Sequence, residues 1–367
     1  MIVRRTYKYR AYLPKAVEGA ASFTLTRCRE LYNAALQERR DAYRLRGVSI
    51  NFYDQSNQLP DVKEVRPEYK DIHSQVLQDV LHRIDKAFQN FFRRVKAGQT
   101  PGYPRFQGRN RYDSVTYPQG GWKLDGDRLT LSKIGTMKLV LHRPLEGQVK
   151  TVSLKREGEH WYVCFSCEVE ATPLPSSDEA VGIDMGLNYF ATLSTGEQFN
   201  NPRYLRKSLA VLAVKQQSLA RKKKGSHRRE KARRAVATVH RRVRNQRADF
   251  AHKLSRQLVN RYGLIVFEDL KPANMVKMHS LALSISDVGW GQFQEFTRHK
   301  AESAGRVCTF VNPAYTSQTC SGCGLVKKKE LSERWHSCPC GVELDRDYNA
   351  ALNILRLGSS QRSSNAA

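Results

Sequence analysis

Four cysteines near the C-terminus have the residue type and spacing of metal ligands. Cys320 and Cys323 form a C-x-x-C pair, Cys338 and Cys340 form a C-x-C pair, and a glycine follows each pair. That glycine lets the backbone turn so that amide groups face the thiolates. Four thiolates hold Zn²⁺ in a closed tetrahedral site, so the pattern predicts one structural zinc ion. Because the second pair is one residue short, His336 is an alternative ligand, and reduced thiols without metal are the other interpretation.

The other four cysteines do not have this pattern. Cys164 and Cys167 are also spaced C-x-x-C, but they lie in a segment that alternates like a strand. Residues three apart in a strand point to opposite faces, so the two thiols cannot share an ion. Cys28 and Cys308 lie among apolar residues. We therefore expect these four cysteines to be packing residues.

Three carboxylates occupy the ends of apolar segments. Asp184 ends VGID, Glu268 ends LIVFE, and Asp347 opens DRDYNAALNILR. Each of them alone is a common cap or turn residue. Carboxylates at the ends of buried strands, however, cost free energy unless a cation offsets them. Two Mg²⁺ ions about 3.5–4 Å apart would fit, one positioning water and the other stabilising the leaving oxygen in phosphodiester hydrolysis.

The last helix offers two aspartates, Asp345 and Asp347, which are two residues apart and cannot face the same ions. Asp347 precedes Ala350 and Ala351 by three and four residues. These apolar residues indicate the buried face of the helix, so Asp347 shares that face. Asp345 lies just outside the helix, where aspartate is a common N-cap. The spacing therefore favours Asp347 as the third metal ligand.

The N-terminal half has the pattern of a sheet with a helical insertion. Residues 7–13 alternate like a strand, and further strand patterns (LTLSKIGTMKLVL, VKTVSLKRE and HWYVCFSCEVE) lie between 129 and 170. Apolar residues at helical spacing cover about 16–46 and 72–97. The simplest fold is a β-barrel begun by the first strand and completed by the later ones, with the helices inserted between them.

The pattern changes after residues 171–180, ATPLPSSDEA, which have the composition of a linker. Apolar strands then alternate with helical segments, including a helix expected at about 287–303 and the final helix opened by DRDYNAALNILR. Alternating strands and helices of this kind indicate a mixed α/β domain. This domain carries all three carboxylates and the cysteine pairs.

A strongly basic segment interrupts that domain. Residues 203–261 contain 20 Lys and Arg and two acids, which is +18 of the total +27. Helically spaced apolar residues and a break at Gly225-Ser226 predict a basic helical hairpin. Acids are too few for i,i+4 ion pairs to explain the charge, so contact with nucleic-acid phosphates is the better explanation. The candidate contact residues are Arg221, Lys222, Lys223, Lys224, Arg228, Arg229, Arg241 and Arg242.

The composition of the whole chain restricts its partners. The 367 residues include 62 Lys and Arg against 35 Asp and Glu. A compact protein with this charge repels itself unless a polyanion neutralises it, and nucleic acid is the usual polyanion. No apolar run approaches the ~20 residues of a membrane span, and the first residues lack a signal peptide's apolar core. We therefore expect a cytosolic protein with no membrane partner.

Aromatic residues among the N-terminal basic residues are candidates for stacking on bases. We expect most of them to be core residues instead. They are Tyr7, Tyr9, Tyr53, Tyr103, Phe106 and Tyr112.

The C-terminal half resembles the transposon-encoded TnpB family, relatives of type V CRISPR effector nucleases. The order of first acid, basic insert, second acid, cysteine pairs and third acid is that of the family. The N-terminal segments RTYKYRAYLP, CRELYNAAL and PGYPRFQGR look like the family's opening segments. The most specific resembling segments are GIDMGL (182–187), FEDL (267–270), NPAYTSQTCSGCG (312–324), CPCG (338–341) and DRDYNAALNIL (345–355).

This resemblance implies an RNA-guided DNA endonuclease that cuts next to a short motif read by the protein. By motif matching, Asp184, Glu268 and Asp347 are the catalytic ligands of two Mg²⁺ ions, and the four paired cysteines hold one structural Zn²⁺. The implied partners are a guide RNA from the transposon end and double-stranded target DNA, and a monomer is favoured. The implied location is the prokaryotic cytoplasm, with nucleoid association when DNA is bound.

The resemblance also implies a multidomain α/β fold. An N-terminal wedge-type β-barrel with a helical recognition insert precedes an RNase H-like (RuvC) domain, which contains the basic helical insert and an inserted zinc ribbon. The implied boundaries are 1–14 and 110–172 for the barrel, 15–109 for the recognition insert, 178–312 and 343–358 for the RuvC-like domain, 313–342 for the zinc ribbon and 359–367 for a disordered tail.

Two other functions fit the sequence. One is a nuclease-inactive, RNA-guided DNA-binding regulator, which the loss of one acid would favour, although all three acids are present. The other is a DNA transposase with an RNase H-like core. Against it, the cysteine pairs lie between the second and third acids, and the second acid ends a strand pattern.

Overall fold

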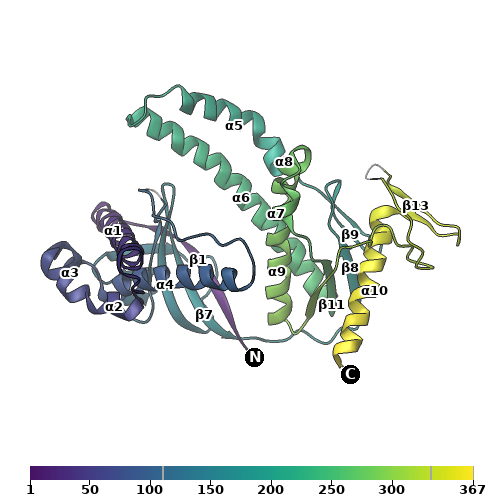
Figure 1. The fold of residues 1–367 in the computed structure, drawn as a ribbon, viewed down its shortest axis with the longest axis horizontal. Helices are drawn as coiled ribbons and strands as arrows, with labels where there is room; N and C mark the ends of the chain where they lie inside the picture. The colour runs from purple at the N-terminus through teal and green to yellow at the C-terminus, as the bar shows by residue number, and fades with distance from the viewer. Residues whose placement is uncertain (110, 331–332, 367) are drawn as a thin grey trace. The chain divides into compact units, whose positions relative to one another are not determined.

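The computed structural model describes residues 1–109, 111–330 and 333–366. The chain forms two compact units: an N-terminal unit, Ile2–Glu170, and a C-terminal unit that begins at Ala171 and includes Met1. Each unit has its own sheet and its own hydrophobic core (Figure 1). None of the described helices is long and apolar enough to cross a lipid bilayer.

The N-terminal unit is built on a seven-stranded antiparallel sheet with the order β2-β6-β7-β1-β5-β4-β3. The first strand pairs with β5 and β7, which confirms that it joins the later strands. Among the described residues, β2 and β3 are not hydrogen-bonded to each other, so the sheet is not closed into a complete barrel. The strands are β1 Ile2–Tyr12, β2 Ser114–Tyr117, β3 Trp122–Asp125, β4 Arg128–Leu131, β5 Gly135–Val140, β6 Gln148–Glu157 and β7 His160–Glu170.

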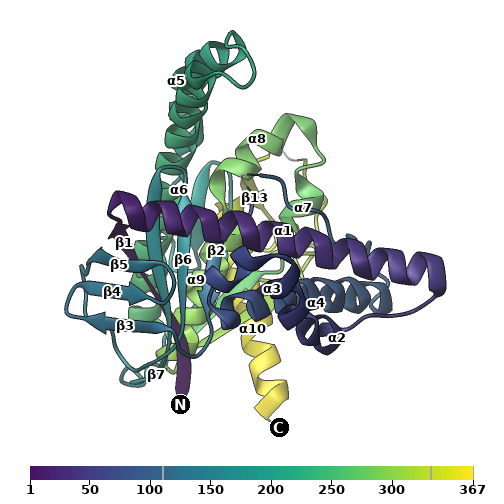
Figure 2. The ribbon, with the colours of Figure 1, turned by 90° about the vertical axis from the view of Figure 1, so that its left-hand side faces the viewer.

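Two long helices, α1 (Lys15–Arg46) and α4 (Ser74–Lys96), pack against each other and share one core with the sheet (Figure 2). Leu36 from α1 and Leu77 from α4 are both almost completely buried in this core. The predicted helical insertion is therefore confirmed, with each boundary within two residues of its expected place. The short connecting elements are α2 Phe52–Asn57, α3 Leu59–Val65 and the 3₁₀ helix η1 Pro67–Asp71.

The C-terminal unit contains a five-stranded sheet with the order β10-β9-β8-β11-β12. The three strands β8, β11 and β12 are parallel, while β9 and β10 are antiparallel to their neighbours. This confirms the predicted mixed α/β unit. The strands are β8 Ala180–Asp184, β9 Tyr189–Leu193, β10 Gln198–Asn200, β11 Leu264–Glu268 and β12 Val307–Val311.

Helices cover both faces of this sheet. Along β11, Ile265 and Phe267 pack with residues of α6 and α9, whereas Leu264 and Val266 pack with Ile354 of α10. The two sets alternate because successive strand residues point to opposite faces. The helices of this unit are α5 Tyr204–Ala220, α6 His227–Arg261, α7 Pro272–Met275, α8 His279–Val288, α9 Trp290–Ser303 and α10 Arg346–Ala366.

The predicted basic hairpin is formed by α5 and α6, which lie side by side in Figures 1 and 2. The break falls at Gly225-Ser226 as expected, because Gly225 has φ +85° and the Ser226 side chain accepts a bond from the Arg229 N–H at 3.2 Å. Arg229 also stabilises this turn through its guanidinium, which donates to the carbonyls of Leu219 and Lys222 at 2.9 Å each.

Two helices differ from the sequence expectations. The helix expected at about 287–303 is present as α9, which begins at Trp290 after Gly289, with φ +73°, and a separate helix, α8, ends at Val288. The tail expected to be disordered from residue 359 instead continues α10 as far as Ala366. A two-stranded antiparallel ribbon, β13 Trp335–Ser337 with β14 Glu343–Asp345, precedes that helix.

Gly182 allows α10 to lie directly on β8. A Cβ atom at this position would lie 2.2 Å from the Ala351 carbonyl oxygen and 2.5 Å from the Leu355 nitrogen. Gly182→Ala is therefore expected to force α10 outward and to lower the free energy of unfolding by about 1–3 kcal/mol, the usual cost of overpacking. Urea unfolding measures this change.

Gly291→Ala is the matched control for that measurement. Gly291 is the second residue of α9, and a Cβ atom added to it would have no neighbour within 4 Å. Alanine is the better helix former, so this substitution should raise stability by at most about 0.5–1 kcal/mol. Equal effects of the two substitutions would contradict the close packing of α10 on β8.

Candidate active site and cysteine cluster

Asp184 and Glu268 lie side by side at one edge of the C-terminal sheet. They end the neighbouring parallel strands β8 and β11, in which Ile183 pairs with Phe267. Gly182 and Val266, each two residues earlier, both face α10. Because strand residues two apart share a face, both carboxylates point to the side of the sheet that α10 covers.

Asp347 approaches the same place from the first turn of α10. It is 9% exposed, and Ala350, Ala351 and Ile354 of the same helix are almost fully buried. The Asp345 side chain accepts bonds from the N–H groups of Asp347 and Tyr348 at 2.9 and 3.1 Å. The expectations that Asp347 lies on the buried face and that Asp345 caps the helix are therefore confirmed.

The three carboxylates affect one another electrostatically. Burial raises the pKa of Asp184 well above its ordinary value, and the negative charges of Glu268 and Asp347 raise it further. Burial likewise raises the pKa of Glu268, although a hydrogen bond from Thr316 opposes this shift. A bound cation would favour the ionised form of these carboxylates and so oppose the upward pKa shifts.

The donor set at this edge fits hard divalent cations, because carboxylate oxygens are the ligands that Mg²⁺ prefers. Among the described residues, the ligand atoms of the four paired cysteines lie close enough together to hold one ion, whereas those of the three carboxylates do not. The carboxylates are therefore not a closed single-ion site. A more open arrangement is compatible with two cations that also bind substrate oxygens.

Two arginines lie beside Asp347. Nε of Arg346 is 3.4 Å from its carboxylate, and Nη1 of Arg334, just before β13, is 3.9 Å from the same oxygen. About half of the Arg334 side chain is exposed. The carboxylates therefore lie next to positive charge that can meet a phosphate group.

Polar contacts that sequence reasoning missed hold the site together. The Thr316 hydroxyl donates to the Glu268 carboxylate. Asn353 of α10 donates to the Thr316 carbonyl at 2.9 Å, and Asn349 donates to the Thr319 carbonyl at 2.8 Å and accepts from the Ser321 N–H at 2.9 Å. The sequence signal for these contacts is a pair of asparagines, four residues apart, on an otherwise apolar helix face.

The four paired cysteines form one cluster. Their sulfur atoms all lie within 4.8 Å of one another, with Cys320 and Cys340 3.6 Å apart and Cys323 and Cys338 3.5 Å apart. Tetrahedral zinc with Zn–S bonds of about 2.3 Å requires sulfur separations of roughly 3.8 Å. The cluster therefore fits zinc, and the shorter C-x-C pair does not prevent Cys340 from joining it.

The surroundings lower the pKa of one thiol of the cluster, Cys320. Burial raises the pKa of Cys320, but backbone N–H groups of Cys323 and Gly322 and the His336 imidazole lower it to about 5. For Cys338 a backbone N–H lowers the pKa, but burial and the neighbouring thiols raise it to about 12, and the pKa of Cys340 is also raised. Gly324 and Gly341, with φ +81° and +88°, form the turns expected after each pair. His336 is buried and contacts Lys329 through Nδ1, so it lies outside the four-sulfur set.

The remaining cysteines are placed as expected. Cys164 and Cys167 lie on opposite faces of β7, one partly and one fully buried. Cys28 is buried within α1, and Cys308 packs partly buried against the core of the C-terminal unit.

The candidate nucleic-acid-binding residues differ in solvent exposure and in the hydrogen bonds that they already make. Arg221, Lys223, Lys224 and Arg228 are exposed around the turn between α5 and α6. Arg229 is partly buried and already bonded to two carbonyls in that turn. Lys222 and Arg241 are partly buried and Arg242 is exposed. The hairpin therefore carries a cluster of exposed positive charge, with Arg229 placed to stabilise the turn.

Three family profiles match the chain. A family described as a probable transposase matches residues 163–279, a Cas12f1-like TNB domain matches 290–354, and a helix-turn-helix domain of the transposase family matches 1–47. In this structure residues 1–47 form strand β1 and the single long helix α1 rather than two helices. The profiles that match are therefore those of a transposase-like class of proteins.

Relatives that match nearly the whole chain identify the family more closely. A protein of Streptomyces pristinaespiralis, provisionally named an RNA-guided DNA endonuclease, is 36% identical over 97% of this chain and 90% of its own length. InsQ of Escherichia coli strain K12, with the same provisional name, is 33% identical over 90% of this chain and 86% of its own. The chain belongs to the TnpB family.

A solved structure supports the fold. The Cas12f1 chain in a complex with sgRNA and target DNA has 14% identity and a TM-score of 0.59, covering 96% of this chain and 98% of that one. At this identity the likeness concerns the fold alone.

Proposed function

We propose that this protein is an RNA-guided, metal-dependent DNA endonuclease encoded by a transposon, which cuts target DNA beside a short motif that the protein reads. The observation that carries the proposal is the convergence of Asp184, Glu268 and Asp347 at one edge of the C-terminal sheet. The full-length relatives that bear the name RNA-guided DNA endonuclease support it. The likeness in fold to a Cas12f1 chain supports the architecture that the proposal requires.

In this proposal the three carboxylates hold the catalytic cations of a RuvC-like site. Asp184, Glu268 and Asp347 would hold Mg²⁺, whose chemistry there would be to activate water and to stabilise the leaving oxygen. Asp184 and Glu268 are fixed by the strands that they end, and Thr316 orients Glu268. Arg334 and Arg346 reduce the repulsion between the acids and an incoming phosphate.

The cysteine cluster is proposed to hold one structural Zn²⁺. Its first pair follows the segment that contacts both Glu268 and α10, through Thr316, Asn349 and Asn353. Closing the cluster on zinc therefore fixes the chain next to the catalytic acids. The rest of the proposed layout follows the expected plan, with guide RNA and the target-adjacent motif read by the wedge-type barrel and its recognition insert.

We expect the exposed cations of the hairpin to contact phosphates of RNA or DNA. A variant with Arg221, Lys222, Lys223, Lys224 and Arg228 changed to Gln should bind more weakly and with a smaller salt dependence. The slope of log affinity against log salt should fall by about 0.7–0.9 for each phosphate that the variant no longer neutralises. Filter binding over a salt series measures both quantities.

Two controls isolate the charge effect. Arg229 is left unchanged because its loss would disturb the turn. A second variant with Lys222, Lys223 and Lys224 changed to Arg keeps the charge and should bind like the parent. Parent-like affinity and salt slope in the Gln variant would show that this hairpin does not bind nucleic acid.

The nuclease is distinguished from its two alternatives in two steps. A discrete structured RNA that co-purifies with the chain supports an RNA-guided protein over an RNase H-like transposase. Mg²⁺-dependent cutting of DNA that matches this RNA then separates the nuclease from an inactive RNA-guided regulator. A purified chain without RNA, or one that never cuts matched DNA, would count against the proposal.

A further inference from the structure

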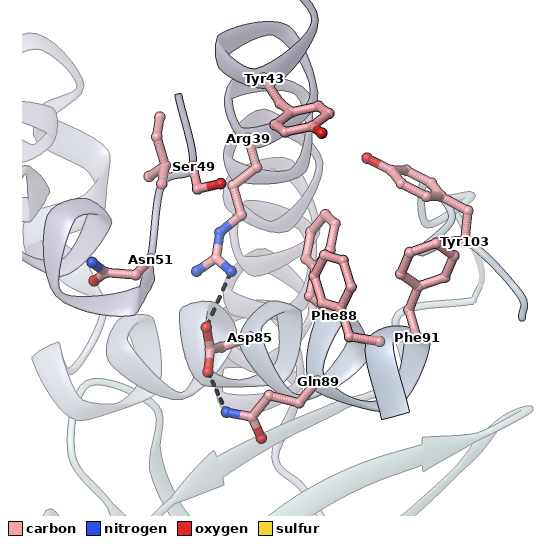
Figure 3. A pocket seen from close by; sticks show the side chains of 11 residues that line it. Arg39, Tyr43, Ser49, Asn51, Asp85, Phe88, Gln89, Phe91 and Tyr103 are labelled. Carbon is pink, nitrogen blue, oxygen red and sulfur yellow. Dashed lines mark hydrogen bonds and ion pairs between the residues drawn. The ribbon is translucent and has the colours of Figure 1, made fainter. Parts of the chain in front are cut away.

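A pocket in the N-terminal unit lies between the C-terminal ends of α1 and α4. Its cavity volume is about 670 Å³, within the roughly 300–1,000 Å³ of small-ligand sites. Figure 3 shows side chains from α1, from the loop after it, from α4 and from the loop at Tyr103 arranged around one space. This pocket takes no part in the proposed metal chemistry, because no catalytic carboxylate or paired cysteine lines it.

One wall of the pocket is aromatic. Tyr103 meets Phe88 and Phe91 edge to face, with ring centroids 5.6 and 5.4 Å apart, and Phe91 meets Phe92 in the same way at 5.2 Å. Tyr43 of α1 adds a fifth ring (Figure 3). Tyr43, Phe92 and Tyr103 are 68%, 55% and 47% exposed. Such exposure of clustered rings leaves their faces available for stacking.

The pocket also contains a buried hydrogen-bond donor. Arg39 is only 7% exposed and reaches from α1 into the middle of the lining residues (Figure 3). Its Nε donates to Gln55 at 2.8 Å and its Nη1 to Asp85 at 3.1 Å, but its Nη2 is buried with no partner in the protein. A buried donor without an acceptor costs free energy, so a ligand with an acceptor group would be stabilised here.

Positive charge is concentrated at the C-terminal ends of the two helices that contribute to the pocket. The last turns of α1 and α4 contain Arg44, Arg46, Arg93, Arg94 and Lys96, all exposed. These residues lie at the C-termini of the two helices and offset the partial negative charge there. Their number and exposure also suit a ligand that carries phosphates.

Aromatic faces, an unpartnered guanidinium N–H and cationic helix ends are together the features of a site for an unpaired nucleobase. We propose that this pocket receives one extruded base of the RNA that the protein carries, which stacks on the aromatic wall and accepts a hydrogen bond from Arg39. RNA is favoured over duplex DNA because loops and bulges of RNA present unstacked bases, whereas a base in a duplex must first be flipped out. This inference rests on the proposed RNA-guided function.

The test uses the full-length protein and the RNA that co-purifies with it, sequenced and then transcribed in vitro. The photo-cross-linking residue p-benzoylphenylalanine replaces Phe92, and the cross-linked nucleotide is mapped. We expect a cross-link to one RNA nucleotide. Affinity for this RNA should fall about 5- to 150-fold in Phe92→Ala and in Tyr103→Ala, the range for losing one stacked base.

Two controls make the result specific to the pocket. Tyr12→Ala removes an aromatic side chain that is 57% exposed and does not line the pocket, and it should keep the parent affinity. Removing the cross-linked base to leave an abasic site should weaken binding by the parent. For Phe92→Ala, the abasic RNA should bind only slightly more weakly than the intact RNA, because the base and the ring act as one interacting pair.

Three results would overturn the inference. These are a cross-link to a second copy of the chain, a cross-link to target DNA instead of RNA, and parent-like affinity in both pocket variants. If the chain bound no RNA at all, the proposed function would fail together with this inference. If the parent bound RNA and cut DNA while both pocket variants bound normally, the pocket inference alone would fail.

Discussion

Asp347→Ala is expected to abolish Mg²⁺-dependent DNA cleavage while leaving RNA-guided target binding largely intact, and the same is expected of Asp184→Ala and Glu268→Ala. Each carboxylate lies where cations would bind substrate oxygens, and cations supply several kcal/mol of transition-state stabilisation. A loss of about 10³-fold or more in cutting rate follows from that magnitude. A linearisation assay with Mg²⁺, beside a binding assay on the same target, measures both properties.

Unfolding should not account for the lost cutting. Burial and the neighbouring acids raise the pKa of Asp184, so its ionised form is less favourable in the folded than in the unfolded chain. Near neutral pH an ionised group of this kind destabilises the metal-free fold, and that effect disappears as the pH falls through its raised pKa. Asp184→Asn should therefore raise the thermal midpoint of the metal-free protein while abolishing cleavage.

Asp345 provides the matched control, because it lies two residues from Asp347 and caps α10. Asp345→Ser keeps an oxygen that can cap the helix and should cut normally. Asp345→Ala should retain appreciable cutting, with about 0.5–2 kcal/mol lost from the cap. If Asp347→Ala cut normally while Asp345→Ala did not, Asp345 would be the third catalytic acid. Normal cutting by Asp184→Ala would contradict the nuclease mechanism.

The sequence was sufficient to predict the features that local pattern controls. The continuous apolar runs that end in Asp184 and Glu268 placed these residues at strand ends, and the period of α10 placed Asp347 on its buried face. The spacing within each cysteine pair is equally local, whereas the two pairs meet across 15 and 20 residues of the chain. Apart from that meeting, the relevant neighbours in these cases lie within one helix turn or one strand.

Contacts between distant segments could not be read from such patterns. Thr316 meets Glu268 across 48 residues, and Arg39 meets Asp85 across 46. No periodicity links the two partners in either pair, so the polar support of the acids and the aromatic pocket were both missed. The role of Arg229 in the hairpin turn was hidden for a different reason, since a charged residue in a basic run looks the same whether it is free or bonded to carbonyls.

Cys320→Ser is expected to release zinc, to lower the thermal midpoint and to reduce cleavage. Zinc binding contributes directly to the folding of such sites, by an apparent 10–16 kcal/mol in isolated zinc-binding peptides. The reduction in cleavage follows from connectivity. Cys320 comes four residues after Thr316, which bonds Glu268, and the intervening chain is held to α10 by Asn349 and Asn353.

Cys320→Ser should therefore lose zinc, thermal stability and cleavage together, a combination that is not expected of the acid variants. Metal analysis of the purified parent should find about one zinc ion per chain. Cys164→Ser, at a half-buried cysteine on β7 outside the cluster, should keep that ion and the parent's cutting. Full zinc content and an unchanged thermal midpoint in Cys320→Ser would contradict the four-cysteine site. If Cys320→Ser lost zinc but cut DNA as fast as the parent, the four-cysteine site would be supported. That result would also show that the Thr316 segment holds Glu268 without the metal.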